Sequence, residues 1–219
     1  MDHRQHASAL PVDFLPMKFY FVRHGESEAN VLGIISNRDL PHGLTAHGRT
    51  QAELLAKQLR RLEPAKIFAS PILRAQQTAD ILAKRLRVPF SVTDALREYD
   101  CGILEGKSDK ASWEQHHLQF GNWVERERWD SRTEGGESFD DMRARFVPFI
   151  ESLVKQEPAN ANLILIGHGG IFLLMLPLVL ANVTHAFALS QSFRNTAYVL
   201  AETRADKLMC VEWCGVQVL

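Results

Sequence analysis

The chain has few cysteines and almost no net charge. Its 219 residues include three cysteines, Cys101, Cys210 and Cys214. So small and odd a number argues against the disulfide framework of a secreted domain. Lys and Arg number 25 and Asp and Glu number 26, so the formal charge is −1. That balance provides no basic surface for nucleic acid or for an anionic membrane. We therefore expect a cytoplasmic protein with no nucleic-acid partner and no membrane partner.

Targeting and membrane signals are also weak. Residues 1–16 lack the apolar core of about 7–15 residues that a signal peptide needs. We expect them to form a disordered extension, and both Met1 and Met17 stay open as the start. The stretch 163–181 carries no formal charge and is long enough for a bilayer, but the glycines and histidine of 167–170 interrupt it. A buried strand followed by a buried helix explains this stretch better than a membrane span.

Short apolar runs alternate along the chain with segments whose apolar residues recur at helical spacing. Thr45, Ser70 and Ser138 are candidate N-caps of the helices, with Pro71 at a first helical position. Buried strands that alternate with amphipathic helices indicate one α/β domain over 17–219, a three-layer α/β/α sandwich with a mostly parallel central sheet. The predicted strands are 18–22, 66–69, 162–166, 196–201 and 209–213.

The stretch 107–135 differs from the rest of the chain. It holds Trp113, Trp123 and Trp129 among many charges, and its apolar spacing is irregular. We expect a small helical insertion over the edge of the sheet that carries the site. The tryptophans are expected to pack this insertion. The alternative is that they wall one side of a substrate pocket, which would favour a substrate with an apolar or ring portion.

Two segments at strand ends place histidine beside glycine. Arg23-His24-Gly25 follows the first predicted strand, and Gly167-His168-Gly169 follows the third. Sites in open α/β sheets form at the carboxyl ends of strands, and parallel strands bring both histidines to one edge. Histidine serves as nucleophile, acid, base or metal ligand, and Arg23 offers a fork of donors for phosphate oxygens. A polar turn explains either segment alone better than it explains the pair.

Arg74 and a group of three carboxylates are further candidates for this edge. Arg74 lies in the first turn of a helix that follows a strand. Glu98, Asp100 and Glu105 lie close together in one loop, and a carboxylic acid can protonate a leaving group. By spacing alone, a solvated arginine and solvated loop acids are the more usual explanation, and the shared edge with the two histidines is what makes Arg74 a candidate phosphate ligand.

Taken together, these segments resemble the histidine phosphatase (phosphoglycerate mutase-like) superfamily, in the family's order from residue 17 to residue 201. The resemblance implies that His24 is the nucleophile and forms a phosphohistidine that water hydrolyses. It implies Glu98 as the proton donor, with Asp100 as a less favoured substitute. The matching segments are 23–26, 44–52, 70–71 with Arg74, 78–79, 96–106, 136–138, 167–170 and 195–196.

The resemblance also implies which residues bind phosphate. Arg23, Arg74 and His168 would hold the transferring phosphate and complete the catalytic set. Because His24 must be neutral and Glu98 protonated, the rate is expected to peak on the acidic side of neutrality. No metal and no cofactor are implied. The full set of phosphate or substrate contacts is Arg23, Asn30, Asn37, Arg74, His168 and Gly169, with Arg38 as an alternative to Asn37.

Members of this superfamily differ mainly in what surrounds the phosphate pocket. Cofactor-dependent mutases carry a longer insertion with an arginine-rich stretch, which 107–135 lacks. Residues 171–174 are apolar where many members carry an arginine. That departure bears on packing or substrate reach rather than on chemistry. The lack of the arginine-rich stretch favours a metal-independent phosphomonoesterase acting on a small phosphorylated metabolite. A mutase of the phosphoglycerate type and a non-catalytic phosphate-binding protein are the alternatives, and a homodimer stays open.

Overall fold

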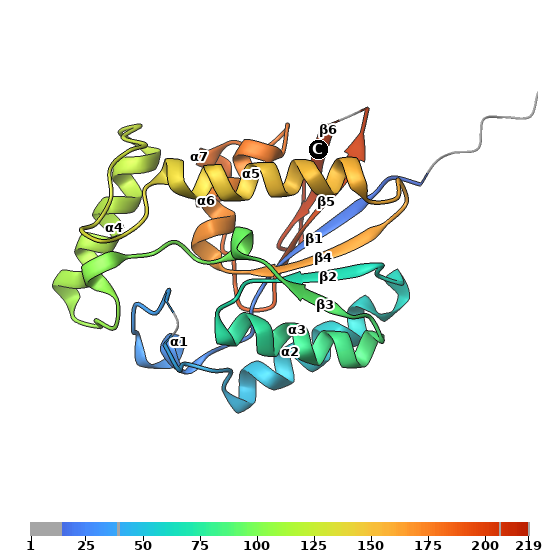
Figure 1. Cartoon of the computed structure of the whole chain (residues 1–219), viewed down its shortest axis with the longest axis horizontal. Coiled ribbons are helices and arrows are strands. Elements are labelled where there is room, and N and C mark those ends of the chain that lie inside the picture. Colours follow the sequence, from blue (N-terminus) through green and yellow to red (C-terminus); the bar gives the residue numbers. More distant parts are fainter. Residues whose placement is uncertain (1–14, 39, 206, 219) are drawn as a thin grey trace, which may run out of the picture.

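The chain folds into three layers, with a sheet between two layers of helices (Figure 1). A computed structural model describes residues 15–38, 40–205 and 207–218. All of the predicted N-terminal extension except residues 15 and 16 therefore lies outside the described residues. Within them, the sheet has seven strands in the order β3-β2-β4-β1-β5-β6-β7. The strands are β1 (Lys18–Arg23), β2 (Lys66–Ala69), β3 (Phe90–Val92), β4 (Asn162–Gly167), β5 (Tyr198–Arg204), β6 (Lys207–Trp213) and β7 (Val216–Gln217).

One side of the sheet is parallel and the other is antiparallel. β3, β2, β4 and β1 pair in parallel, whereas β5, β6 and β7 pair antiparallel to their neighbours. In β1, Phe19 and Phe21 face one apolar cluster while Tyr20 and Val22 face another. A strand needs such a nearly continuous apolar run when both faces of the sheet are covered. The predicted α/β sandwich with a largely parallel core is confirmed.

Helices cover both faces of this sheet (Figure 1). α2 and α3 pack on one face, and α5, α6 and α7 pack on the other. No helix among 15–38, 40–205 and 207–218 is long and apolar enough to cross a membrane. The helices are α1 (Glu28–Leu32), α2 (Ala46–Leu59), α3 (Leu73–Leu86), α4 (Lys110–Val124), α5 (Phe139–Gln156), α6 (Gly169–Val179) and α7 (His185–Ser190), with 3-10 turns at Arg60–Leu62, Asp94–Leu96 and Gly102–Leu104.

Two of the three predicted helix caps are confirmed and one is wrong. Thr45 accepts the N–H of Gly48 at the start of α2, and Ser138 caps α5. Ser70 does not cap α3, which begins two residues after Pro71. The reason is that the Ser70 hydroxyl is used elsewhere, in contact with His168.

The strands also differ from the prediction: β6 begins at Lys207 rather than at residue 209, and the short strand β7 was not predicted. β5 begins at Tyr198 rather than at residue 196. The backbone of Thr196 is left-handed, with φ of 58°, and its N–H donates to the carbonyl of Arg23, so it cannot extend the strand. The three-residue strand β3 was not predicted, because two of its three residues are exposed and leave no buried apolar run to detect.

Candidate active site

His24 and His168 meet because the strands that precede them are neighbours. β1 and β4 pair in parallel with Arg23 opposite Gly167. The next residue of each strand is a histidine, and the two ring centroids lie 5.0 Å apart. The His24 N–H donates to the Gly167 carbonyl at 3.1 Å, which continues the ladder into the site. The predicted meeting of the two histidines at one sheet edge is therefore observed.

Hydrogen bonds fix the protonation of the His24 ring. Its Nδ1 lies 2.6 Å from the carbonyl of Gly25, which can only accept, so Nδ1 carries the hydrogen. The lone pair is then on Nε2, where the Nε–H of Arg74 donates at 3.0 Å. Burial, and after it the charges of Arg74 and Arg23, hold the pKa of His24 well below its usual value. At neutral pH His24 is a neutral imidazole with its lone pair directed at Arg74.

Three buried nitrogen atoms in this site have no partner among the described residues. They are Nε of Arg23, Nη1 of Arg74 and Nδ1 of His168. Buried donors without partners are rare in folded proteins, and three in one site indicate a missing acceptor. Both arginines are permanent donors well suited to a planar or tetrahedral oxyanion. The arrangement therefore fits a phosphate group placed against His24.

Two contacts hold these donors in place. Arg23 Nη1 donates to the carbonyl of Phe193 at 2.6 Å. Ser70 Oγ accepts the N–H of Ile72 at 3.2 Å, so its own hydrogen is available to His168 Nε2 at 2.7 Å. Since the buried Ser70 hydroxyl has no other acceptor among the described residues, it donates to Nε2, and the ring hydrogen of His168 is on Nδ1, the unpartnered atom. Burial and the nearby charge of Arg74 lower the pKa of His168 well below its usual value, so the ring donates while neutral.

Glu98 lies at the N-terminus of α6. Its carboxyl oxygens accept the N–H of Gly170 at 2.9 Å and the N–H of Ile171 at 2.6 Å. Burial raises the pKa of Glu98 above its usual value, although these two N–H groups and Arg74 act in the opposite direction. A carboxyl group with a raised pKa in a cleft is a candidate proton donor.

Gly170 is needed at this position because the backbone approaches the acid so closely. A Cβ on Gly170 would lie 2.6 Å from Tyr99 Cε1 and 2.8 Å from Glu98 Oε1. Both distances are too short for real atoms, so a side chain here would displace Glu98 or Tyr99. The predicted His-Gly-Gly segment thus supplies His168 as a hydrogen-bond donor, and its Gly170 leaves the space that the Glu98 carboxyl group occupies.

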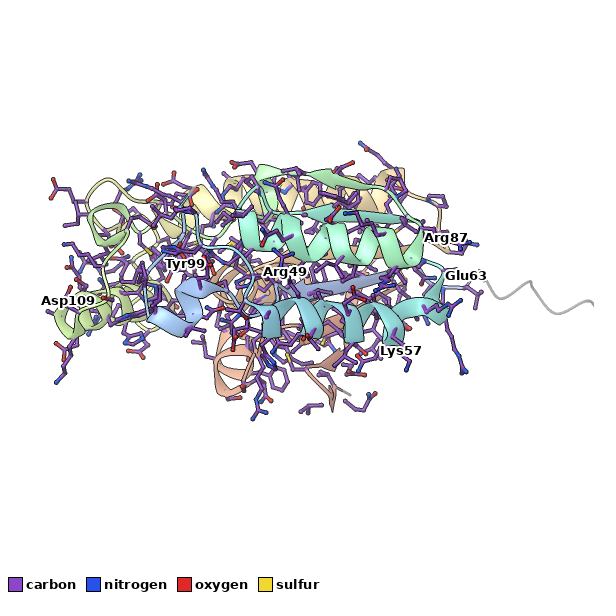
Figure 2. The ribbon with its side chains drawn as sticks, turned by 90° about the horizontal axis from the view of Figure 1, so that it is seen from below. Arg49, Lys57, Glu63, Arg87, Tyr99 and Asp109 are labelled. Carbon is purple, nitrogen blue, oxygen red and sulfur yellow. The ribbon has the colours of Figure 1, made fainter. Side chains whose placement is uncertain are left out.

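Most of these groups line a cavity of about 490 Å³, whereas His168 lies behind its wall and is not one of the lining residues. Those that line it are Arg23, His24, Arg74, Glu98 and Gly170. Figure 2 shows Tyr99, which lines it, at the end of the molecule that carries α1 and α4, opposite Glu63 and Arg87. α4 lies within the predicted insertion and covers this end of the structure (Figure 1). Of the three tryptophans, Trp113 lines the cavity, while Trp123 is almost fully buried and packs on Tyr99. The packing role is thus observed for Trp123, and the pocket wall is formed by Trp113.

The other predicted site residues, Asn30, Asn37 and Gly169, line the cavity but differ in the contacts that they make. Asn30 lines the cavity, and its Oδ1 accepts from Ser27 and Asn195, which leaves its N–H groups available. Asn37 also lines the cavity, but its amide donates to Cys101 Sγ at 3.1 Å. Gly169 lies against Arg23 at the cavity wall.

Asp100, the less favoured candidate acid, is paired with Arg38 and lies outside the cavity lining. Arg38 Nε donates to both of its carboxylate oxygens, at 2.9 and 2.8 Å. Asp100 does not line the cavity and Glu98 does. Arg38 is thereby held on Asp100, so it is not directed at the cavity either.

Sequence reasoning missed three residues that build the site. Ser70 was expected to cap a helix, yet it orients His168. The carbonyl of Phe193 anchors Arg23, and a backbone group leaves no mark in the sequence. His116 was not singled out as a site residue, yet its Nε2 lies 2.6 Å from the Tyr99 hydroxyl at the cavity wall. Its helical spacing from Trp113 was the signal that could have found it.

Residues 15–38, 40–205 and 207–218 contain no group of three or more His, Cys, Asp or Glu side chains arranged to hold a metal ion.

Comparison with known proteins agrees with this site. A probable phosphatase of Schizosaccharomyces pombe is 44% identical over 87 residues, which are 40% of this chain and 31% of that protein. A putative phosphoserine phosphatase 2 of Hydrogenobacter thermophilus is 32% identical over 154 residues, 70% of this chain and 73% of that protein. The chain spans about a third of the length of several curated relatives that it matches, the S. pombe protein among them.

Solved structures and a family model extend the comparison to the whole described domain. A mycobacterial glucosyl-3-phosphoglycerate phosphatase in complex with VO3 superposes with a TM-score of 0.75 at 25% identity, over 90% of this chain and 98% of that one. The family model described as histidine phosphatase superfamily (branch 1) matches residues 19–215. Together with the paired histidines and their arginines, this match shows that the chain belongs to the histidine phosphatase superfamily, branch 1.

Proposed function

We propose that the chain is a phosphomonoesterase that works through a phosphohistidine at His24 and needs no metal ion. One observation carries the proposal. The unprotonated Nε2 of His24 lies 3.0 Å from Arg74 Nε, and buried nitrogen atoms of Arg23, Arg74 and His168 in the same site have no partner among the described residues. Phosphoryl transfer depends mainly on positioning and on stabilising charge, which these donors supply without a cation.

In the first step, the lone pair of His24 Nε2 attacks phosphorus. The Arg74 N–H that occupies this lone pair in the empty site turns to a phosphate oxygen as the ester enters. The bond from phosphorus to the bridging oxygen breaks while the new N–P bond forms. The carboxyl proton of Glu98 passes to the bridging oxygen, and the alcohol leaves neutral.

In the second step, water attacks the phosphohistidine. The carboxylate of Glu98, left by the first step, takes a proton from this water as its oxygen bonds to phosphorus. The N–P bond breaks, inorganic phosphate leaves, and His24 returns as a neutral ring. The carbonyl of Gly25 holds Nδ1–H throughout, so Nε2 is always the reacting nitrogen.

The relatives support this reaction class. Two curated relatives are named as phosphatases, and the mycobacterial phosphatase structure holds VO3, an oxyanion that occupies phosphate sites. The cysteines Cys101, Cys210 and Cys214 are free thiols, which is consistent with the predicted cytoplasmic location. The predicted homodimer is not tested by any of these observations and stays a prediction.

The test is phosphate release from a panel of phosphomonoesters in excess EDTA. His24→Ala is compared with wild type and with His47→Ala, a matched control because His47 is exposed on α2. We expect turnover in EDTA that His24→Ala abolishes and His47→Ala preserves. Mass spectrometry of rapidly quenched enzyme should find phosphate on the peptide that contains His24. Turnover that needs a metal, or that survives His24→Ala, would contradict the proposal. Isomerisation of 3-phosphoglycerate without release would indicate the mutase instead.

A further inference from the structure

The cavity is much larger than one phosphate group requires. Its volume of about 490 Å³ falls within the range of about 300–1,000 Å³ for sites that hold whole small molecules. The phosphate-binding donors gather around His24. The remaining volume is available to the alcohol part of an ester.

Aromatic and aliphatic side chains line much of this remaining volume, together with the polar side chains of Ser36, Asn37, His117 and Ser192. α4 presents Trp113 and His116, whose ring centroids lie 5.0 Å apart, and His116 stacks on Tyr99 at 5.6 Å. Trp113 Nε1 donates to the carbonyl of Gly33 and the Tyr99 hydroxyl contacts His116 Nε2, so the one polar ring atom left without a partner among the described residues is the buried Nδ1 of His116. Apart from that nitrogen, these rings offer a ligand ring faces and carbon atoms. We call this surface the distal wall, and its residues are Ile34, Tyr99, Trp113, His116, Phe120, Leu173 and Phe193.

The distal wall offers no fixed positive charge. Among the described residues that line the cavity, the Lys and Arg side chains are Arg23 and Arg74, and both belong to the phosphate site. Burial lowers the pKa of His116 to about 4, so its ring is neutral at neutral pH. His117 also lines the cavity but is exposed to water. A second phosphate or a carboxylate on the substrate would lose its hydration at the distal wall without gaining a counter-ion.

We propose that the preferred substrate is the monophosphate ester of an uncharged alcohol that carries a ring, with the ring held against the distal wall. This inference rests on the phosphomonoesterase activity proposed above. It sets the chain apart from the two relatives named for phosphoserine and for glucosyl-3-phosphoglycerate, since both of those substrates carry charge beyond the phosphate that is removed.

The first test compares kcat/KM for benzyl phosphate with kcat/KM for phosphoserine and 3-phosphoglycerate. Filling an apolar pocket with one well-fitting group changes kcat/KM by about 10-fold to 200-fold. We expect benzyl phosphate to be preferred by at least about tenfold, mainly through a lower KM. Equal values, or a preference for either charged substrate, would overturn the proposal.

The second test adds the missing charge. Leu173 is half-buried on α6 at the distal wall, and Leu178 is exposed on the same helix outside the cavity. Leu173→Arg should lower kcat/KM for benzyl phosphate and raise it for 3-phosphoglycerate, whereas Leu178→Arg should change neither. Inhibition by inorganic phosphate, which does not reach the distal wall, should be the same in both variants and in wild type. No change of ranking in a Leu173→Arg variant that still binds phosphate would also count against the distal wall.

The two proposals fail in different ways. If no ester is hydrolysed in a His24-dependent manner, the proposed function fails. If esters are hydrolysed through His24 but charged alcohols are preferred, the phosphatase stands and the substrate class is wrong.

Discussion

Arg145 and Glu137 form a bidentate ion pair behind the segment that carries Glu98. Nε and Nη2 of Arg145 each lie 3.0 Å from one carboxylate oxygen of Glu137. Arg145 Nη1 also donates to the carbonyls of Asp94, Ala95 and Arg97. One side chain on α5 therefore fixes the backbone that leads directly into the candidate acid.

The contacts of Arg145 with Glu137 and with the three carbonyls act as a clamp. Loss of this clamp should destabilise the fold and let the position of Glu98 vary. In Arg145→Lys the three carbonyls and the fork to Glu137 cannot all be satisfied. Both side chains are about 15% exposed, and the loss of a charge-assisted hydrogen bond should lower the unfolding free energy by about 1.5–3 kcal/mol. Water should also reach Glu98 and lower its raised pKa, which moves the alkaline limb of the kcat profile to lower pH.

The matched control is Arg143→Lys, also on α5 but paired with Asp140 at the surface. It should leave both the urea unfolding curve and the pH profile unchanged. A stability loss in Arg145→Lys with an unmoved alkaline limb would show that the clamp supports the fold alone.

The pH dependence of turnover should have two limbs, and each limb reports the titration of one residue. Glu98 acts while protonated and its pKa is raised, so the rate falls as pH rises through that pKa. His24 acts while neutral and its pKa is lowered, so the acid limb lies below the usual histidine range. Glu98→Gln should remove the alkaline limb and slow alkyl phosphates by about 10²–10⁴-fold.

Leaving groups separate this role from a general loss of structure. Nitrophenyl phosphate, whose leaving group needs little protonation, should suffer much less from Glu98→Gln than an alkyl phosphate does. The control is Glu134→Gln, which changes an exposed glutamate in the loop between α4 and α5 and should retain both limbs of the pH profile. Equal slowing of both esters would argue against Glu98 as proton donor.

Arg74 should contribute strongly to turnover. It contacts the nucleophile at 3.0 Å and keeps an unpartnered buried Nη1. Arg74→Lys retains the charge but cannot bind His24 and a phosphate oxygen together, so kcat should fall by about 10²–10³-fold. Arg49→Lys on the exposed face of α2 is the comparison, measured by steady-state kinetics on one substrate. Near-wild-type kcat in Arg74→Lys would remove Arg74 from the mechanism.

A single methyl group should distinguish two glycines. Gly170→Ala would place a Cβ on Tyr99 and Glu98, so activity should fall by at least about 10²-fold, since small misplacements at a reacting centre are that costly. Gly121→Ala on α4 meets its nearest neighbour, the Glu125 side chain, at an ordinary 3.5 Å. It should leave kcat unchanged and stabilise the protein by about 0.5–1 kcal/mol, through helix propensity. Full activity in Gly170→Ala would show that the acid tolerates displacement.

The sequence predicted the parts of this molecule that depend on local patterns. Apolar runs marked β1, β2 and β4, and their order placed His24 and His168 at one edge. The motifs identified the family to which the chain belongs. Local patterns cannot show which carbonyl lies beside an arginine, so the contacts of Phe193 with Arg23 and of Ser70 with His168 were found only in the structure. The strand β3 was not predicted, because an exposed strand at the edge of the sheet needs no repeating pattern of apolar residues.

The pairing of β1 has a consequence for how the chain reaches its active form. Both neighbours of β1 come from the last third of the chain, at β4 and β5. During synthesis β1 is therefore made well before its partners, which lie more than a hundred residues further along the chain. Until they are made, this apolar strand has no strand to pair with. Contacts so distant in sequence form slowly and leave such segments open to aggregation or to chaperones. Recovery of enzyme activity in a refolding experiment should accordingly follow the closure of the central sheet and lag behind the return of helical signal.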